Sequence, residues 1–147
     1  MDQTKPSRDV VQEFLEKHFK MVLAMNEHDG EGYPNNSIMH YAVGKDLHMY
    51  FGTKRSFGKY DSLKKDPRVA YVVIDDGLDP LCAVDGRGIA KELSPSEAQY
   101  AYEYFKRNNT TKWYIEGAQD FAMFVIEPTD IRWVDGRSGN LVTVDID

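Results

Sequence analysis

The sequence predicts a mainly β (α+β) domain, in which an antiparallel barrel carries helices at its edges. Most of its periodic segments alternate apolar and polar residues, and short turn sequences separate them, as in antiparallel hairpins. Helical segments stand at the start, in the middle and before the last strands, which fits a small barrel with helices at its edges. The chain has 147 residues and no linker or repeat, so we expect residues 1–147 to form a single domain.

The first helix is expected within residues 1–18. Ser7 is a typical N-cap, and the apolar residues after it recur at helical spacing, which predicts one buried face. These apolar residues are Val10, Val11, Phe14 and Leu15. A short apolar strand follows over residues 20–25, and residues 26–33 are rich in turn formers. The first hairpin is therefore expected to turn there.

Residues 35–43 alternate in a way that predicts a strand with two distinct faces. One face carries Ser37, Met39 and Tyr41, and the other carries Ile38, His40 and Ala42. Gly44-Lys45-Asp46 is a tight turn signal, and residues 47–51 alternate again. The two runs predict a second hairpin.

The rest of the chain predicts two more helices among strands. Residues 59–65 form a short helix that ends at Asp66-Pro67, and residues 94–109 form a helix with Ser94 and Glu97 as its capping box. The expected strands are 69–74, 81–93, 121–126, 131–134 and 141–146.

The charge balance and the cysteine count exclude some classes of protein. Eighteen basic and 24 acidic residues give a formal net charge of −6, which argues against a nucleic-acid partner and against an anionic membrane surface. Cys82 is the only cysteine, so no intramolecular disulfide can form, and a cytoplasmic location is the simplest interpretation.

Residues 53–59 form the segment with the clearest chemical character. Three cations, two hydroxyls and one glycine occur within seven residues of an acidic chain, between a strand and a helix. Phosphate groups bind charged and hydroxyl donors together with the free N–H groups of a helix N-terminus. The segment therefore predicts a phosphate site, with a solvated basic surface loop as the alternative.

The order of the surrounding segments resembles the flavin-binding split-barrel family related to pyridoxamine 5′-phosphate oxidase. A strand that ends in Thr53 is followed six positions later by Lys59, and a helix containing Leu63 comes next. The other matching pieces are Met21–Met25, Gly32-Tyr33-Pro34, Ser37–Tyr41 and Asp66-Pro67-Arg68-Val69-Ala70. The resemblance implies an antiparallel split β-barrel with flanking helices.

The same resemblance implies FMN held at a homodimer interface, and hence an FMN-dependent oxidoreductase. Thr53 and Lys59 match the family's phosphate-binding positions, and Arg55 and Ser56 are candidate donors in the same loop. Ser37, Met39 and Tyr41 match the segment that runs along the flavin. No catalytic residue is assigned. The alternatives are a non-enzymatic flavin store or sensor, a haem- or deazaflavin-binding split barrel, and a cofactor-free interaction module.

Two departures from the family pattern bear on the substrate. The oxidase members carry an arginine just before the lysine, where this chain has Gly58, and Arg55 or Lys54 could supply the missing charge. The oxidase members also carry an Arg-x-His substrate element, which residues 133–139 lack. The substrate is therefore expected to differ from pyridoxamine phosphate. Trp133 either covers the flavin from the partner subunit or is simply packed.

Other chemistry-bearing residues carry weaker signals, and no metal site is expected. The histidines are His18, His28, His40 and His48. None has metal-like spacing to a cysteine or an acidic cluster, although His40 and His48 could face one another across a hairpin. Cys82 is expected to be a buried apolar group, the aspartates between 75 and 85 a solvated turn, and residues 108–114 a connection, a lid or a dimer contact.

Overall fold

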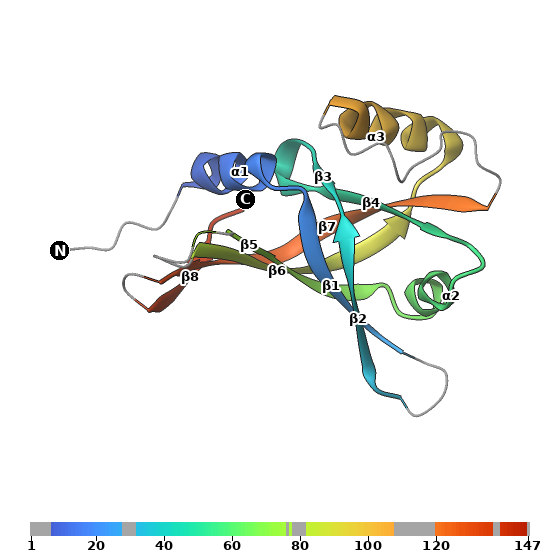
Figure 1. The fold of residues 1–147 in the computed structure, drawn as a ribbon, viewed down its shortest axis with the longest axis horizontal. Helices are drawn as coiled ribbons and strands as arrows, with labels where there is room; N and C mark the ends of the chain where they lie inside the picture. Colours follow the sequence, from blue (N-terminus) through green and yellow to red (C-terminus); the bar gives the residue numbers. More distant parts are fainter. Residues whose placement is uncertain are drawn as a thin grey trace.

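The computed structural model describes residues 7–27, 32–75, 77, 82–107, 120–136 and 139–146, and these residues form a curled antiparallel sheet with three helices (Figure 1). The helices are α1 (Arg8–Lys17), α2 (Gly58–Lys65) and α3 (Pro95–Arg107). The strands are β1 (Lys20–Asn26), β2 (Pro34–His40), β3 (Ala42–Val43), β4 (Met49–Lys54), β5 (Arg68–Ile74), β6 (Cys82–Glu92), β7 (Phe121–Asp135) and β8 (Asn140–Val144). One turn of 3-10 helix, Lys45–Leu47, joins β3 to β4.

The strand order explains why the sheet curls. Neighbouring strands run β2-β1-β5-β6-β7-β4-β3, and β8 pairs with β7. Only Tyr41 lies between β2 and β3, so the two ends of this path are joined by a single residue. The sheet must therefore bend round on itself, which confirms the predicted mainly β fold class, an antiparallel split barrel with flanking helices.

The long strand β7 corrects the sequence prediction, which placed separate strands at 121–126 and 131–134. The chain stays extended through this region, and its pairing with β6 shifts between Arg87 and Gly88. Pro128 lies at this shift, where a residue without an N–H group is tolerated. A Cβ atom at Gly88 would lie 2.4 Å from the carbonyl oxygen of Glu127, so the close approach of the two strands requires glycine there.

The predicted helix starts are confirmed by their caps. The Ser7 hydroxyl accepts the N–H of Val10 at 3.3 Å. At α3, the N–H of Ser94 donates to Glu97 Oε1 at 3.0 Å, and the N–H of Glu97 donates to the Ser94 hydroxyl at 3.4 Å. Residues 108–109 of the expected helix, and all of the expected 108–114 connection, lie outside the described residues.

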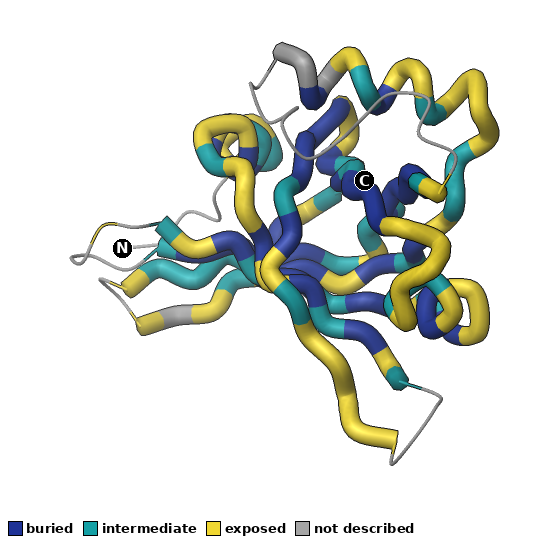
Figure 2. The backbone as a smooth tube through the Cα atoms, turned by 45° about the vertical axis from the view of Figure 1, so that its right-hand side comes forward, coloured by how far each residue is buried: buried dark blue, intermediate teal, exposed yellow. Residues whose placement is uncertain are grey.

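Two apolar clusters hold the helices against the barrel. The larger one fills the barrel interior and includes the buried face of α1. The smaller one lies beneath α3, where Ala101 and Phe105 pack on Ala42 and Met123. Figure 2 shows the buried positions concentrated along the strands, with exposed positions on the helices and on the far part of β2. No helix in the described part of the chain combines the length and apolar character needed to cross a membrane.

Candidate functional site

The predicted phosphate segment links β4 to α2 at one end of the barrel. Thr53 points inward from β4 and is only 3% exposed. Its hydroxyl oxygen is buried and has no hydrogen-bond partner among the described residues. A buried hydroxyl without a partner costs about 1–3 kcal/mol relative to a satisfied one. The fold itself therefore supplies no reason for a hydroxyl at this position.

The start of α2 also leaves polar groups unsatisfied. Phe57 is the N-cap and offers no side-chain hydrogen bond. Within the described part of the chain, the N–H groups of Gly58 and Lys59 have no hydrogen-bond partner. A Cβ atom at Gly58 would meet nothing within 4 Å, so the space in front of this helix end is open. Such an end favours an anion through its free N–H groups and its dipole.

Lys59 brings a partly buried positive charge to the same helix end. Its Nζ lies 3.4 Å from the sulfur of Met39, and no carboxylate of the described residues forms an ion pair with it. Burial lowers the pKa of Lys59 below its ordinary value, since the ammonium loses water without gaining a counter-charge. A thioether is a weak acceptor, so this ammonium could still bind an anion.

Arg55 and Ser56, predicted as phosphate donors, make contacts that hold the segment to the barrel. The Arg55 guanidinium lies 3.1 Å from Glu92 and donates to the carbonyl of Phe121 at 2.8 Å. The Ser56 hydroxyl donates to the carboxylate of Asp120 at 2.6 Å. Because Glu92 compensates the charge of Arg55, Arg55 is a weaker candidate than Lys59 for the cation that binds a phosphate. Lys54 is exposed, and its Nζ lies 5.6 Å from the centre of the Phe57 ring.

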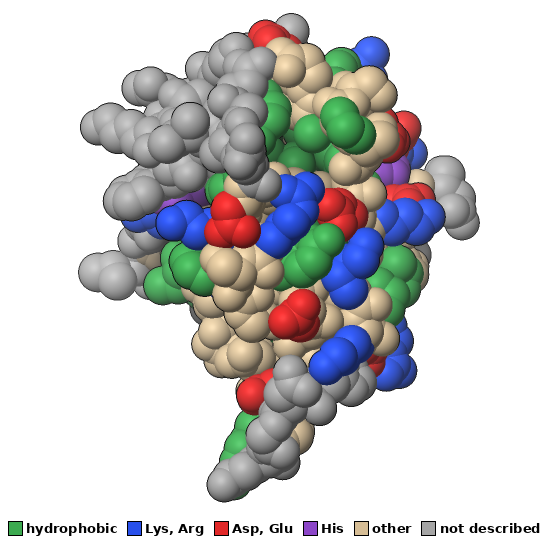
Figure 3. Space-filling model, turned by 90° about the vertical axis from the view of Figure 1, so that its right-hand side faces the viewer, with side chains coloured by type: hydrophobic (Ala, Val, Ile, Leu, Met, Phe, Trp, Pro, Cys, Tyr) green, Lys and Arg blue, Asp and Glu red, His purple; other side chains and the backbone are tan. Residues whose placement is uncertain are grey.

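Glu92 organises this part of the site, although no local sequence pattern points to it. Besides Arg55, its carboxylate accepts the hydroxyl of Tyr60 at 2.7 Å and the ammonium of Lys64 at 3.2 Å. Burial alone would raise the pKa of Glu92, but these donors outweigh it and lower the pKa. The end of β6 is thereby tied to α2. Figure 3 shows acidic and basic side chains alternating over this end of the molecule, rather than a uniform basic patch.

The three candidates around β2 have different surroundings. Met39 lies against Lys59, and Ser37 is half-buried two residues earlier on the same strand face. Tyr41, the third predicted cofactor contact, is a core residue. Its side chain is 1% exposed, and its hydroxyl donates to the carbonyl of Leu15 at 2.7 Å. Ser37, Met39 and Tyr41 lie on one face of the chain by alternation. This face becomes more buried from Ser37 to Tyr41, where β2 passes into β3.

The remaining candidates do not assemble into a second redox or metal site. The N–H of Gly44 donates to the carbonyl of His48, so the register places His48 opposite Gly44, and His40 and His48 do not face one another. Trp133 packs edge-on against Phe14, with 5.2 Å between ring centres. The described residues contain no group of three metal-ligating side chains, and His28 lies outside them.

Comparison with known proteins establishes the family. The family model for pyridoxamine 5′-phosphate oxidase matches residues 7–135, so the chain belongs to this family. A comparison with curated proteins found no significant match.

Solved structures share the fold at low sequence identity. A haem-binding protein from Mycobacterium smegmatis is 20% identical with a TM-score of 0.79, over 97% of this chain and 60% of its own length. An FAD-binding protein from Mesorhizobium loti is 20% identical with a TM-score of 0.67, over 86% of this chain and 92% of its own. The haem storage protein from Vibrio cholerae is 18% identical with a TM-score of 0.66, over 84% of this chain and 91% of its own length.

Proposed function

We propose that this chain binds FMN, with the phosphate at the junction of β4 and α2, and that it is a flavin-dependent oxidoreductase. The observation that carries the proposal is the concentration of unsatisfied donors at one helix start. Thr53 has a buried hydroxyl without a partner, and Lys59 has an ammonium without a carboxylate among the described residues. The N–H groups of Gly58 and Lys59 add to them. We expect a phosphate bound at this helix start to accept hydrogen bonds from these groups.

The groups present fit a phosphate, with one cation fewer than the oxidase pattern. Arg55 is held by Glu92 and Phe121, so Lys59 is the cationic residue that we assign to the phosphate. When bound, the flavin ring would supply the redox chemistry, and the chain would bind and orient it. We therefore assign no side chain as a catalytic acid or base. Because residues 133–139 lack the Arg-x-His element, we propose a substrate other than pyridoxamine phosphate.

A comparison of FMN with riboflavin tests the phosphate site directly, because the two ligands differ only in the phosphate. We expect Lys59→Ala to weaken FMN binding by roughly 10- to 100-fold, the value of a charge-assisted hydrogen bond, and to leave riboflavin binding unchanged. Lys54→Ala, which removes an exposed lysine from the same segment, is the matched control and should change neither affinity. Quenching of flavin fluorescence measures both. Equal loss of FMN and riboflavin binding in Lys59→Ala would contradict the assignment.

Enzymatic activity needs a separate measurement. We expect NADH or NADPH to reduce the bound flavin, followed by turnover with an electron acceptor. Tight flavin binding without reduction by either donor would instead favour a flavin store or sensor.

We further propose that the protein forms a homodimer through the outer face of β1, β2 and β5. The strand register places Ile38, Val22 and Val72 side by side in one row across these strands. Ile38, on the terminal strand β2, is 72% exposed, which is a large exposure for an isoleucine that continues an apolar row. We expect Ile38→Asp to shift the protein from dimer to monomer in analytical ultracentrifugation. A wild-type protein that sediments as a monomer would overturn this proposal.

Haem is a second candidate ligand, because two proteins of the same fold are named for haem binding or storage. The absorbance spectrum of the purified protein, with mass analysis of any released ligand, separates haem from flavin. A Soret band without flavin absorbance would favour haem.

A further inference from the structure

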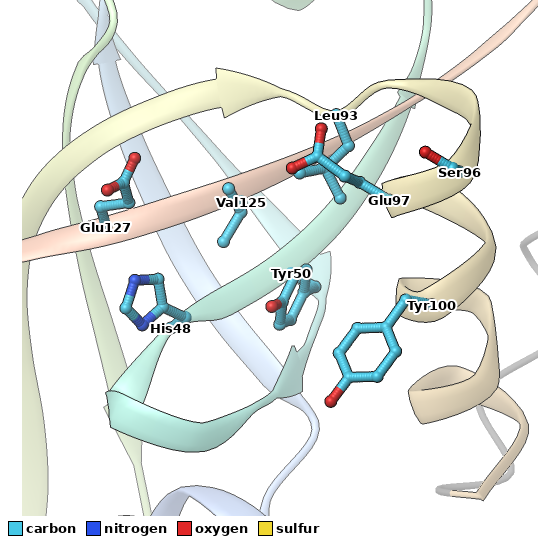
Figure 4. A pocket seen from close by; sticks show the side chains of 8 residues that line it. All are labelled: His48, Tyr50, Leu93, Ser96, Glu97, Tyr100, Val125 and Glu127. Carbon is cyan, nitrogen blue, oxygen red and sulfur yellow. The ribbon is translucent and has the colours of Figure 1, made fainter.

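A pocket of about 540 Å³ lies on the outer side of the barrel, between α3 and the strands β4 and β7 (Figure 4). Its lining residues are His48, Tyr50, Leu93, Ser96, Glu97, Tyr100, Val125 and Glu127. Side chains of β4 alternate between the outer and the inner side of the barrel, so Tyr50 faces this pocket whereas Thr53 faces the barrel interior. The pocket is therefore distinct from the proposed phosphate site.

The strand register and the helix period explain how these residues come together. Tyr50 pairs with Val125, and each has a second pocket residue two positions away, His48 on one side and Glu127 on the other. On the other side of the pocket from Tyr50 and Val125, α3 packs on the barrel through its buried residues Ala101 and Phe105. Ser96, Glu97 and Tyr100 lie on the flank of the helix, within one turn of each other, and form the opposite wall.

The chemistry of the lining favours a cation. Neither lysine nor arginine occurs among the lining residues, whereas two carboxylates do. Glu127 has a counter-charge, because the Lys91 ammonium lies 2.5 Å from it. Glu97 has no cationic partner among the described side chains, and its carboxylate is fixed by the N–H of Ser94. The hydrogen bonds from Ser94 lower the pKa of Glu97, so the carboxylate is ionised at neutral pH.

Two tyrosine rings and two aliphatic side chains complete the lining. Tyr50 comes from the barrel and Tyr100 from α3, and Val125 and Leu93 supply apolar surface between them. The electron-rich face of a tyrosine attracts ammonium groups, and the aliphatic surface favours an apolar body. Burial raises the pKa of the Tyr50 hydroxyl, and the neighbouring Tyr100 and Glu97 raise it further.

We propose that this pocket binds a small organic ammonium compound, with the charge at Glu97 and the apolar body between Tyr50 and Tyr100. This site is separate from the flavin proposal and does not rest on it. It predicts that ligand charge decides binding: an amine binds, its neutral analogue binds less well, and its carboxylate analogue is rejected.

The test uses benzylammonium, benzyl alcohol and benzoate, which share one ring and differ in charge. In calorimetric titrations at pH 7 we expect benzylammonium to bind with a Kd on the order of 1 mM, as is typical for a ligand of this size. Benzyl alcohol should bind several-fold more weakly, and benzoate should give no binding. Benzoate binding equal to that of benzylammonium would overturn the proposal, as would no binding of any probe.

Two variants place the binding in this pocket. Glu97→Gln removes the charge but keeps an amide oxygen for the N–H of Ser94, so the capping box and α3 should persist. It should abolish most of the preference for benzylammonium over benzyl alcohol. Tyr100→Ala, at a position that is 54% exposed, should weaken benzylammonium binding roughly three- to tenfold. Tyr33→Ala, an exposed tyrosine outside the pocket, is the control and should change nothing.

The flavin measurements keep the two proposals apart. Glu97→Gln and Tyr100→Ala should leave FMN affinity unchanged, because neither residue belongs to the β4–α2 junction. If both variants bind benzylammonium as the wild type does, the pocket assignment is wrong whatever the FMN result.

Discussion

The two ends of α2 differ sharply in how their polar groups are satisfied. At the C-terminal end, Asp66 accepts the Arg68 guanidinium at 2.9 and 2.6 Å, the N–H of Arg68 at 3.1 Å and the side-chain amide of Asn26 at 3.0 Å. At the N-terminal end, Phe57 provides no side-chain cap. The Thr53 hydroxyl lacks any partner and Lys59 lacks a carboxylate among the described residues.

The difference separates polar groups that hold the fold from polar groups available to a ligand. A folded chain normally pairs its buried polar groups, and this one does so completely around Asp66. The unsatisfied end of the same helix therefore costs stability that a ligand could recover. Substitutions at the C-terminal end should mainly affect folding, and those at the N-terminal end should mainly affect ligand binding.

Asp66→Ala should reduce stability more than any substitution at the N-terminal end of α2. It leaves Asn26 and Arg68 without their shared acceptor at a position that is only 6% exposed. We expect a clear fall in the urea midpoint, while the FMN affinity of the folded protein stays unchanged. A protein of normal stability with impaired FMN binding would reverse the roles assigned to the two helix ends.

The same residue gives a pH dependence. The Arg68 guanidinium and the Asn26 amide hold the pKa of Asp66 well below its usual range. A carboxyl with a depressed pKa stabilises the folded state above its unfolded pKa of about 4, and this contribution is lost as the pH falls. The difference in stability between wild type and Asp66→Ala should therefore shrink below about pH 4.

Lys59→Met should have the second largest effect, with opposite signs for folding and binding. The methionine would pack against Met39 without a charge to bury, so the free energy of unfolding should rise by ~0.5 kcal/mol, a value reduced for the partial exposure of Lys59. FMN affinity should fall by more than about tenfold. Urea denaturation of the ligand-free protein measures the first effect, and flavin titration the second.

The pH provides a control for this substitution. Burial lowers the pKa of Lys59 in the folded protein, so folding disfavours its charge. The free-energy cost of burying this charge is complete at neutral pH. It disappears as the pH rises above the pKa of lysine in the unfolded chain, about 10.4. The stability gain of Lys59→Met should disappear with it. A gain that persists at high pH would mean that packing, rather than the charge, is responsible.

Much of the barrel was predictable from the sequence because local signals determine it. The alternation over residues 35–43, the capping pair Ser94 and Glu97, and the Asp66-Pro67 helix stop each reflect neighbours in the chain. The long strand β7 was not predictable, because a proline such as Pro128 suggests the end of a strand. Only the pairing with β6 shows that β7 continues past a bulge. The role of Glu92 depends on residues 28 to 37 positions away and left no local pattern.

The candidate site was predicted in part for the same reason. The sequence placed the basic segment between a strand and a helix, as the structure does, and left open whether Arg55 or Lys54 supplies a second cation beside Lys59. Only the tertiary structure shows that Arg55 is compensated by Glu92 and that Lys59 has no acidic partner among the described residues. For Tyr41, alternation gave the right face, but which side of the sheet becomes the barrel interior depends on strand pairing.

Gly58→Arg tests whether the open helix start can accept the missing cation. A Cβ atom at this position would meet nothing within 4 Å, so we expect an arginine to be accommodated there and to contact a phosphate bound at the helix start. We expect FMN affinity to rise by about tenfold and riboflavin affinity to stay constant. Gly58→Ala is the control: it should gain up to about 1 kcal/mol of stability from helix propensity and no FMN affinity. If both variants bind FMN equally well, the arginine does not contact the phosphate.

Thr53→Val should weaken FMN binding less than Lys59→Met does, and it tests the buried hydroxyl directly. The shape of the side chain is nearly kept, so the change removes one polar group that the ligand-free fold leaves unsatisfied. The ligand-free protein should be as stable as the wild type or up to about 1 kcal/mol more stable. FMN affinity should fall roughly three- to tenfold, the value of one neutral hydrogen bond, with riboflavin unaffected. A loss of stability instead would mean that the hydroxyl serves the fold, and that the two ends of α2 are more alike than their contacts indicate.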